Sequence, residues 1–230
     1  MKKKYQRIAL VGLDGCGKST NIDEMKKDLC YQDYEFLWVR WEPTLLRPLY
    51  AIINKSIKKD NAVSKNDTAE NIASRDSINK DYSKKSLLKK KIFSNPVIRF
   101  MWMEMALIDY FIQFYIKAAK LVFQKKNIIF DRYYLDLFVD QGINFGYSPE
   151  KVESFIKKKK WLFPKINKTI YLKVSPEVCY ERKDDIPNLK YLYDRYEIYE
   201  HLSINDNWAV IDGEMSLDEV YSQIRDIILA

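Results

Sequence analysis

Histidine, cysteine and glycine are scarce in this chain of 230 residues, with counts of 1, 3 and 6. Cys16, Cys30 and Cys179 show no C-x-x-C or metal-ligand spacing, and His201 is the one histidine that could join them. The sequence therefore argues against a disulfide framework and against a zinc site.

Long uninterrupted apolar runs are also lacking. The opening Met-Lys-Lys-Lys is followed by an apolar stretch from Ile8 to Leu13, which is about half as long as the apolar part of a signal peptide. A longer apolar stretch at 96–123 is interrupted by Glu104 and Asp109, so it does not fit a membrane span. We expect a cytoplasmic chain that has no membrane partner.

Acidic residues are fewer than basic residues, and the formal net charge is +7. The basic runs Lys2–Lys4, Lys89–Lys91 and Lys157–Lys160 contain no interleaved stacking aromatics and match no nucleic-acid-binding motif. We interpret them as solvated faces that attract polyanionic small molecules such as ATP, and we expect no nucleic-acid partner. The alternative, a nucleic-acid-binding protein, would show an affinity that falls steeply with salt.

Half of the glycines lie in one motif. Residues 12–19 read Gly-Leu-Asp-Gly-Cys-Gly-Lys-Ser, which matches G-x-x-x-x-G-K-[ST] and directly follows the apolar run Ile8–Val11. A glycine-rich turn between a strand and a helix can direct backbone N–H groups at phosphate, while Lys18 meets the β- and γ-phosphates and Ser19 ligates Mg²⁺. The alternative, a turn that binds nothing, requires neither the Lys-Ser pair nor three spaced glycines.

The rest of the chain alternates short apolar runs with helical patterns. We predict strands at 8–11, 34–40, 127–130, 168–174 and 208–211, and helices at 20–30, 45–57, 96–123 and from 217 onwards. Ile22, Met25 and Leu29 would form the apolar face of the first helix, and 96–123 would be a buried central helix. This alternation predicts one α/β domain over residues 1–230, with a parallel five-stranded sheet and helices on both faces.

A polar segment at 58–91 interrupts this pattern. Its lysine, asparagine, aspartate and serine residues leave few large apolar side chains. Such a segment could cover a bound substrate or be an inert insertion, and the inert interpretation is favoured slightly.

Asp131 and Arg132 follow the predicted strand at 127–130, at the end of the strand where ligands bind in open α/β sheets. Phosphoryl transfer brings two polyanions together and requires cations for both. Asp131 suits a carboxylate that holds Mg²⁺ through water, and Arg132 suits an acceptor phosphate because a guanidinium binds two oxygens at once. The alternatives are a solvated Asp-Arg pair without metal and an arginine at the edge of the core that is paired with a carboxylate.

Further motifs stand in order along the chain. They are Arg40-Trp41-Glu42-Pro43, Asp131-Arg132-Tyr133 followed by Gln141-Gly142, Ser175-Pro176-Glu177-Val178 leading to Arg182, and Val210-Ile211-Asp212. With these motifs and residues 12–20, the chain resembles the thymidylate kinases, a family of P-loop nucleoside-monophosphate kinases, over nearly its whole length. The resemblance implies a P-loop kinase fold with a short lid, ATP and Mg²⁺ as cofactors, and dTMP as the phosphoryl acceptor. It leaves a homodimer open.

The resemblance also implies roles for single residues. Asp14 would face the acceptor sugar and Gln141 the acceptor base, and the alternatives are a turn-capping aspartate and a helix-surface glutamine. A lid at about 182–190 would supply the transition-state cation from Arg182, or else from Arg195. The ATP site would comprise Gly12, Asp14, Gly15, Cys16, Gly17, Lys18, Ser19 and Thr20. The acceptor site would comprise Asp14, Arg40, Arg132, Tyr133, Asp136 and Gln141. Ser19 and Asp131 would bind the metal, and the catalytic residues would be Lys18, Asp131, Arg132 and Arg182.

Three departures from the family fall on the acceptor side. Asp109, with Tyr110 and Phe111, stands where relatives carry an arginine, Asp136 stands in place of a common serine, and Asp140 in place of a common tyrosine. These changes make the site less suited to an acceptor phosphate. The alternatives are therefore a kinase of another nucleotide, a nucleoside or a sugar phosphate, and a P-loop ATPase or switch that acts through a protein partner.

Overall fold

The fold is described from a computed structural model, which covers residues 5–45, 47–48 and 92–229. The predicted helix at 45–57 lies outside the described residues, apart from residues 45, 47 and 48. The polar segment at 58–91 lies wholly outside them.

Five parallel strands form the sheet, in the order β2-β3-β1-β4-β5. They are β1 (Arg7–Gly12), β2 (Tyr34–Trp38), β3 (Asn127–Asp131), β4 (Lys168–Lys173) and β5 (Ala209–Asp212). Every residue of β1 is buried, because this central strand has a neighbour on each side and helices above and below. The predicted α/β class and five-stranded parallel sheet are confirmed.

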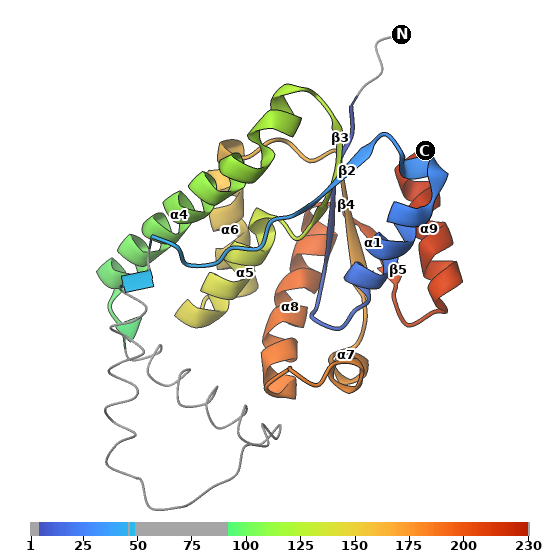
Figure 1. Cartoon of the computed structure of the whole chain (residues 1–230). Helices are drawn as coiled ribbons and strands as arrows, with labels where there is room; N and C mark the ends of the chain where they lie inside the picture. Colours follow the sequence, from blue (N-terminus) through green and yellow to red (C-terminus); the bar gives the residue numbers. More distant parts are fainter. Residues whose placement is uncertain (1–4, 46, 49–91, 230) are drawn as a thin grey trace, which may run out of the picture.

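Helices cover both faces of this sheet (Figure 1), with α1 and α9 on one face and α4, α5, α6 and α8 on the other. Their bounds are α1 (Lys18–Lys27), α4 (Pro96–Phe123), α5 (Tyr134–Phe145), α6 (Pro149–Lys159), α7 (Pro176–Arg182), α8 (Leu189–Asn205) and α9 (Leu217–Leu229). The described residues also form two short 3₁₀ helices, η1 (Leu29–Tyr31) and η3 (Lys160–Leu162). The short helix α7 lies beside the loop that connects β1 to α1.

The predicted bounds of two elements are wrong by two or three residues. α1 begins at Lys18 rather than at residue 20. α1 ends at Lys27 rather than at residue 30, because Asp28 leaves the helix and its side chain caps η1. Leu29 is consequently 77% exposed instead of completing the apolar face of the helix. β2 ends at Trp38 rather than at residue 40, because Trp38 pairs with Asp131, where the partner strand β3 also ends.

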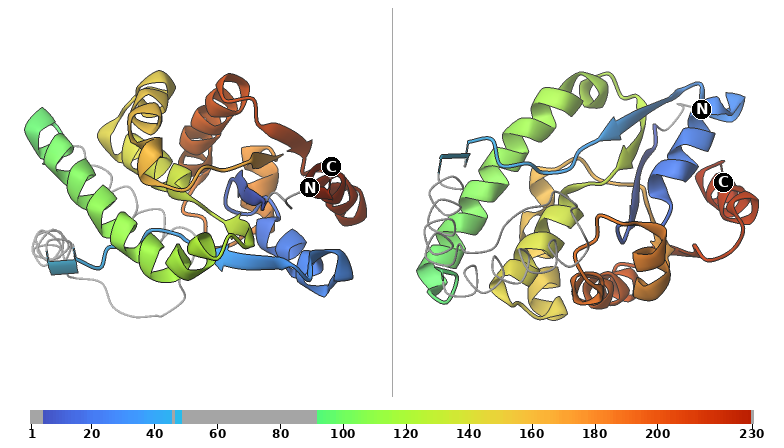
Figure 2. Two further views of the ribbon diagram at one scale, coloured as in Figure 1. Left: turned by 90° about the horizontal axis from the view of Figure 1, so that it is seen from above. Right: turned by 60° about the horizontal axis from the view of Figure 1, so that its bottom comes forward.

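Helix α4 has the predicted bounds but not the predicted burial. The Asn95 side chain accepts hydrogen bonds from the first N–H groups of the helix, and Pro96 stands in its first turn, which fixes the start. One face, including Trp102 and Phe114, is buried, whereas Ile108 and Ile116 on the opposite face are 56% and 79% exposed. The helix lies at the outer edge of its layer (Figure 2), so the prediction of a fully buried central helix is wrong for half of its surface.

No helix in the described part of the chain is both long enough and apolar enough to span a bilayer.

Candidate functional site

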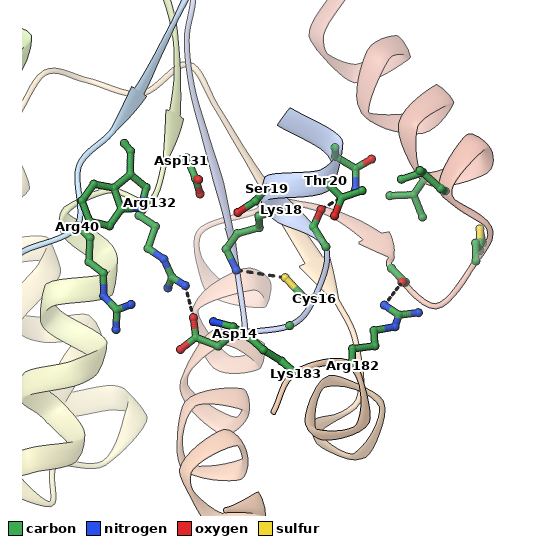
Figure 3. A pocket seen from close by; sticks show the side chains of 18 residues that line it. Asp14, Cys16, Lys18, Ser19, Thr20, Arg40, Asp131, Arg132, Arg182 and Lys183 are labelled. Atoms are coloured by element: carbon green, nitrogen blue, oxygen red, sulfur yellow. Dashed lines mark hydrogen bonds and ion pairs between the residues drawn. The ribbon is translucent and has the colours of Figure 1, made fainter. Parts of the chain in front are cut away.

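The carboxyl ends of three neighbouring strands meet at one edge of the sheet. Asp131, the last residue of β3, is in register with Leu10 of β1 and with Trp38 of β2. The segments that follow these strands therefore start side by side. A pocket of about 550 Å³ opens there (Figure 3), lined by residues 14–21 together with Trp38, Arg40, Asp131, Arg132, Arg182, Lys183, Gly213, Met215, Leu217 and Val220.

The loop between β1 and α1 has a backbone that only glycine adopts readily. Gly15 and Gly17 have φ values of 88° and 94°, in the left-handed region. A Cβ on Gly15 would also lie 2.6 Å from the carbonyl oxygen of Cys179 in α7, so this loop packs directly against a neighbouring backbone. Backbone in this conformation can direct successive N–H groups at an anion, as the sequence motif predicts.

Lys18 lies inside this loop with 5% of its surface exposed. Its ammonium group donates to the carbonyl oxygens of Gly12 and Leu13 at 2.9 and 2.6 Å, and lies 3.3 Å from the sulfur of Cys16. These acceptors hold the charge at the position where a phosphate bound by the loop N–H groups would meet it.

Asp131 and Ser19 lie on the same side of the pocket as Lys18 (Figure 3). Burial raises the pKa of Asp131, and the opposing influence of Lys18 and Arg132 does not cancel it. A partly buried carboxylate whose negative charge is only partly balanced by nearby cations is a suitable ligand for a metal ion, and the Ser19 hydroxyl would be a second oxygen ligand. Among the described residues, no three acidic, histidine or cysteine side chains are placed so that they could hold a metal ion together. This donor set fits Mg²⁺, which is often bound by one or two protein ligands together with substrate phosphates.

Arg132 is held between two carboxylates. It has a φ of 70°, a left-handed conformation that costs a residue with a side chain about 1–2 kcal/mol. Its guanidinium forms an ion pair with Asp14 and donates to Asp136 at 3.0 Å, and its side chain is 14% exposed. The structure thus shows a carboxylate-paired arginine, and the role of Arg132 in binding an acceptor phosphate stays a prediction.

Two tyrosines of α8 complete this network. The Tyr191 hydroxyl donates to Asp14 at 2.8 Å, and the Tyr199 hydroxyl donates to Asp136 at 2.7 Å. Burial alone would raise the pKa of Asp14, but Arg132, Lys18 and the Tyr191 hydroxyl together hold it below its usual value. The loop after β1, the residue that follows β3, and the helices α5 and α8 are therefore joined through one buried network of charged and hydroxyl groups.

Sequence reasoning missed both tyrosines. They are eight residues apart and so lie on one face of a helix, which is the only signal that the sequence carries for them. Nothing in the sequence indicates that this helix face meets Asp14 and Asp136.

Of the other arginines that were predicted to act in the site, two line the pocket and one lies outside it. Arg40 and Arg182 line the pocket, and Arg182, at the end of α7, donates to the carbonyl oxygen of Gly213 at 3.1 Å. Arg195 instead forms an ion pair with Asp140 at 2.5 Å and packs on the ring of Tyr191. Of the two predicted lid arginines, Arg182 is the one that the structure brings to the phosphate loop.

Three predicted acceptor residues do not line this pocket. Tyr133 is 1% exposed and donates to the carbonyl oxygen of Pro164. Gln141 is also 1% exposed and accepts a hydrogen bond from the indole nitrogen of Trp102 at 3.0 Å. Asp136 lies behind Arg132 rather than in the cavity. Their roles toward an acceptor stay predictions.

Asp109, the most conspicuous departure from the family, is fully buried. Its carboxylate accepts hydrogen bonds from the N–H of Thr44 at 2.9 Å, the Thr44 hydroxyl at 2.5 Å, the N–H of Leu45 at 3.3 Å and the Gln113 amide at 2.9 Å. It therefore anchors the segment that follows Arg40 to helix α4.

No family model matches the sequence, and no curated protein matches it. Among solved structures, one similar chain is described as a deoxyadenosine kinase from M. mycoides with the products dCMP and a flexible dCDP bound. The two chains share 19% sequence identity with a TM-score of 0.51, and the match covers 97% of this chain and 98% of that chain. The protein described here thus shares, over nearly its whole length, the α/β fold of that deoxyadenosine kinase.

Proposed function

We propose that this protein is an ATP-dependent kinase that transfers a phosphoryl group to a nucleoside or a nucleoside monophosphate. The observation that carries the proposal is a single pocket lined by the phosphate loop with Lys18 and by the carboxylate of Asp131, whose pKa is raised by burial. The same pocket is lined by Arg40, Arg132 and Arg182. The fold similarity to a deoxyadenosine kinase supports it.

The donor side of the pocket has the groups that ATP requires. Loop N–H groups and Lys18 would bind the β- and γ-phosphates, and Ser19 and Asp131 would hold Mg²⁺, which neutralises charge on the phosphate oxygens. Arg182 enters from the opposite wall, at the end of α7 (Figure 3). Its guanidinium can stabilise the charge that develops on the phosphoryl group during transfer.

For the acceptor, dTMP is the first candidate, because the chain resembles the thymidylate kinases. Arg40 and Arg132 line the pocket together. Both could meet an acceptor phosphate, which a guanidinium binds through two oxygens.

An acceptor without a phosphate, such as a deoxynucleoside, is the second candidate. The double pairing of Arg132 favours it, because a guanidinium already balanced by Asp14 and Asp136 has less charge to offer a phosphate. The Asp14 carboxylate could then accept a hydrogen bond from a sugar hydroxyl.

A screen of acceptors by ADP release with Mg-ATP tests the proposal. The panel contains dTMP, dUMP, dAMP, dCMP, thymidine, deoxyadenosine, deoxycytidine and sugar phosphates. Turnover of a nucleoside or a nucleotide is the expected result, and its identity decides between the two candidates. ATP hydrolysis that no acceptor accelerates would overturn the proposal and favour a P-loop ATPase or switch.

A further inference from the structure

A second pocket, of about 830 Å³, opens at the other end of the strands from the phosphate-binding pocket. Lys168 and Ala209, the first residues of β4 and β5, line it. We call it the amino-end pocket, and its walls are formed mainly by residues 133–135, 163–169 and 206–209 together with Lys160 and Trp161. None of the described residues lines both pockets. Its volume is within the range of cavities that bind small molecules, about 300–1,000 Å³.

We propose that the amino-end pocket binds a small ligand in which a planar aromatic ring is joined to phosphate groups, the chemistry of a nucleotide. The ring lies against the aromatic side chains of the pocket, and the phosphates lie against its lysines. The proposal concerns a site separate from the phosphate-binding pocket, and it does not depend on the proposed kinase activity.

Aromatic side chains form much of the surface of the amino-end pocket. Tyr134 and Phe163 are buried and stack on each other, with ring centres 4.9 Å apart and an angle of 11° between their planes. Trp208 is held edge to face against Tyr171, with ring centres 6.4 Å apart. Trp161 of η3 also lines the pocket, yet it is 76% exposed, whereas aromatic side chains of this size are mostly buried. A planar ring bound in the pocket can stack on this indole, as nucleobases do on aromatic side chains.

The charged side chains of the amino-end pocket favour an anion. Lys160, Lys165 and Lys168 line it, together with one acidic residue, Asp206. The Lys168 ammonium group donates to the carbonyl oxygen of Ile227, which also lines the pocket, so this charge is fixed on the wall. Lys160 and Lys165 form no ion pair with an acidic side chain of the described residues. Their ammonium groups therefore keep donors available for phosphate oxygens.

The presence of rings and lysines in one cavity selects the class of ligand. An apolar molecule would leave the ammonium groups without a counter-charge, and a free phosphate would leave the indole of Trp161 uncovered. A nucleotide supplies both a ring and an anion. The basic run Lys157–Lys160 ends in this pocket, and Trp161 follows it directly, so a charge and a ring reach the ligand from adjacent positions.

¹⁹F NMR of the full chain labelled with 5-fluorotryptophan tests the proposal. The sequence has five tryptophans, of which Trp161 and Trp208 line the amino-end pocket and Trp38 lines the phosphate-binding pocket. Single Trp→Phe variants assign the resonances. At least one of ADP, GDP, CDP and dTDP should shift the Trp161 and Trp208 resonances along one saturable curve, and Lys18→Ala should keep this response. If none of the four nucleotides shifts both resonances at up to millimolar concentrations, the proposal is overturned.

Substitutions of exposed residues separate this site from the phosphate-binding pocket. Lys165→Glu and Trp161→Ala should each raise the dissociation constant read at Trp208 by about 10-fold or more, because each removes a contact to the ligand. Neither should change the response of Trp38. The control is Lys158→Glu, the same change of charge on an exposed lysine of α6 that does not line the pocket. If Lys158→Glu weakened binding as much as Lys165→Glu, the proposed site would be wrong.

Parts of the nucleotide test the two halves of the site. Pyrophosphate and the matching nucleoside should each bind at least about 10-fold more weakly than the nucleotide, because each lacks one set of contacts. Pyrophosphate that binds as tightly as the nucleotide would contradict the place of the ring in the pocket. A nucleoside that binds as tightly would contradict the role of the lysines.

Discussion

Asp131 and Arg132 are neighbours in the chain, but their surroundings act on their charges in opposite ways: those of Asp131 disfavour its charged form, and those of Arg132 favour it. Asp131 faces the phosphate loop with a pKa raised by burial, whereas Arg132 turns toward two carboxylates that keep it charged despite its own burial. The left-handed backbone of Arg132 allows the two side chains to separate in this way. One residue is thus poised for a cation, and the other is already part of the protein's own charge network.

The first prediction is that Asp131→Asn makes the ligand-free protein more stable and less active. Because the folded protein raises the pKa of Asp131, the stability linked to this group is complete below its unfolded value near pH 4 and is lost as pH rises through the folded value. At neutral pH the ionised carboxylate therefore costs stability, and asparagine removes that cost. Thermal unfolding should show a higher Tm for the variant above pH 4 that converges with wild type in acid. An unchanged or lower Tm at pH 7 would contradict the electrostatic setting described for Asp131.

The second prediction concerns Arg132→Ala, which leaves Asp14 and Asp136 buried without their cation. Removal of one partner of a buried ion pair typically costs about 3–5 kcal/mol of unfolding free energy, measurable by urea denaturation. Lys157→Ala, which removes a half-exposed ammonium group from its ion pair with Glu153, is the control and should cost far less, because solvent screens the charge of Lys157.

The pH dependence should change in the same variant. Because the wild-type pKa of Asp14 is depressed, its contribution is present above the unfolded value near pH 4 and is lost as pH falls toward the folded value. Without Arg132 this acid-induced loss should shrink. If Arg132→Ala and Lys157→Ala lowered the free energy of unfolding by the same amount at neutral pH, the network around Arg132 would not stabilise the fold.

At the scale of elements, two segments place arginine side chains in the pocket, and each segment is held by a different hydrogen-bond contact with the rest of the fold. The segment after β2, which carries Arg40, is tied to α4 through Asp109. The segment after β4 carries Arg182 at the end of α7, where its guanidinium contacts the loop at Gly213. Both anchors join elements that are distant in the sequence.

The third prediction is that Asp109→Ala loosens the segment that carries Arg40. Loss of charge-assisted hydrogen bonds to Thr44 and Leu45 should cost about 2 kcal/mol or more. In steady-state kinetics the KM for the acceptor should rise while the KM for ATP changes little, a difference that a general loss of stability would not produce. Asp109→Asn keeps one acceptor oxygen and should have a smaller effect on both quantities. Equal changes in the two KM values would show that Asp109 has no positioning role.

The fourth prediction separates the two lid arginines. Arg182→Ala should lower kcat by about 10²-fold or more with a smaller effect on ATP affinity, because its charge is required mainly when charge develops during transfer. Arg195→Ala, which loses the pair with Asp140, should retain kcat in the folded protein. Single-turnover rates of the two variants check this directly, and the opposite order would move the catalytic role to Arg195.

At the scale of the whole molecule, the strand order explains why distant motifs meet. β1 lies in the centre, β3 beside it and β2 beyond β3, so segments that begin at residues 13, 39 and 132 emerge at one edge. All strands are parallel, which places every carboxyl end at that edge. The phosphate loop, Asp131 and Arg40 are brought together by this order alone.

Sequence reasoning succeeded where the signal was local. The glycine-rich turn between β1 and α1, the five strands and the bounds of α4 follow from a short motif and from the spacing of apolar residues. It failed where contacts are long-range: the pairing of Arg132 with Asp14 joins residues 118 apart, and the Tyr191–Asp14 contact joins residues 177 apart. It also misjudged α4, because apolar residues around a helix do not reveal whether the chain itself covers every face.

The most direct test of the proposed kinase activity compares the wild-type protein with Lys18→Ala. ³¹P NMR should detect transfer of the γ-phosphoryl group of Mg-ATP to a nucleoside or nucleoside monophosphate in the wild type. Lys18→Ala should keep the wild-type circular dichroism spectrum and lose the transfer, because Lys18 stabilises the moving charge. A folded Lys18→Ala variant that transfers phosphate at the wild-type rate would contradict the assignment of this pocket as the catalytic site.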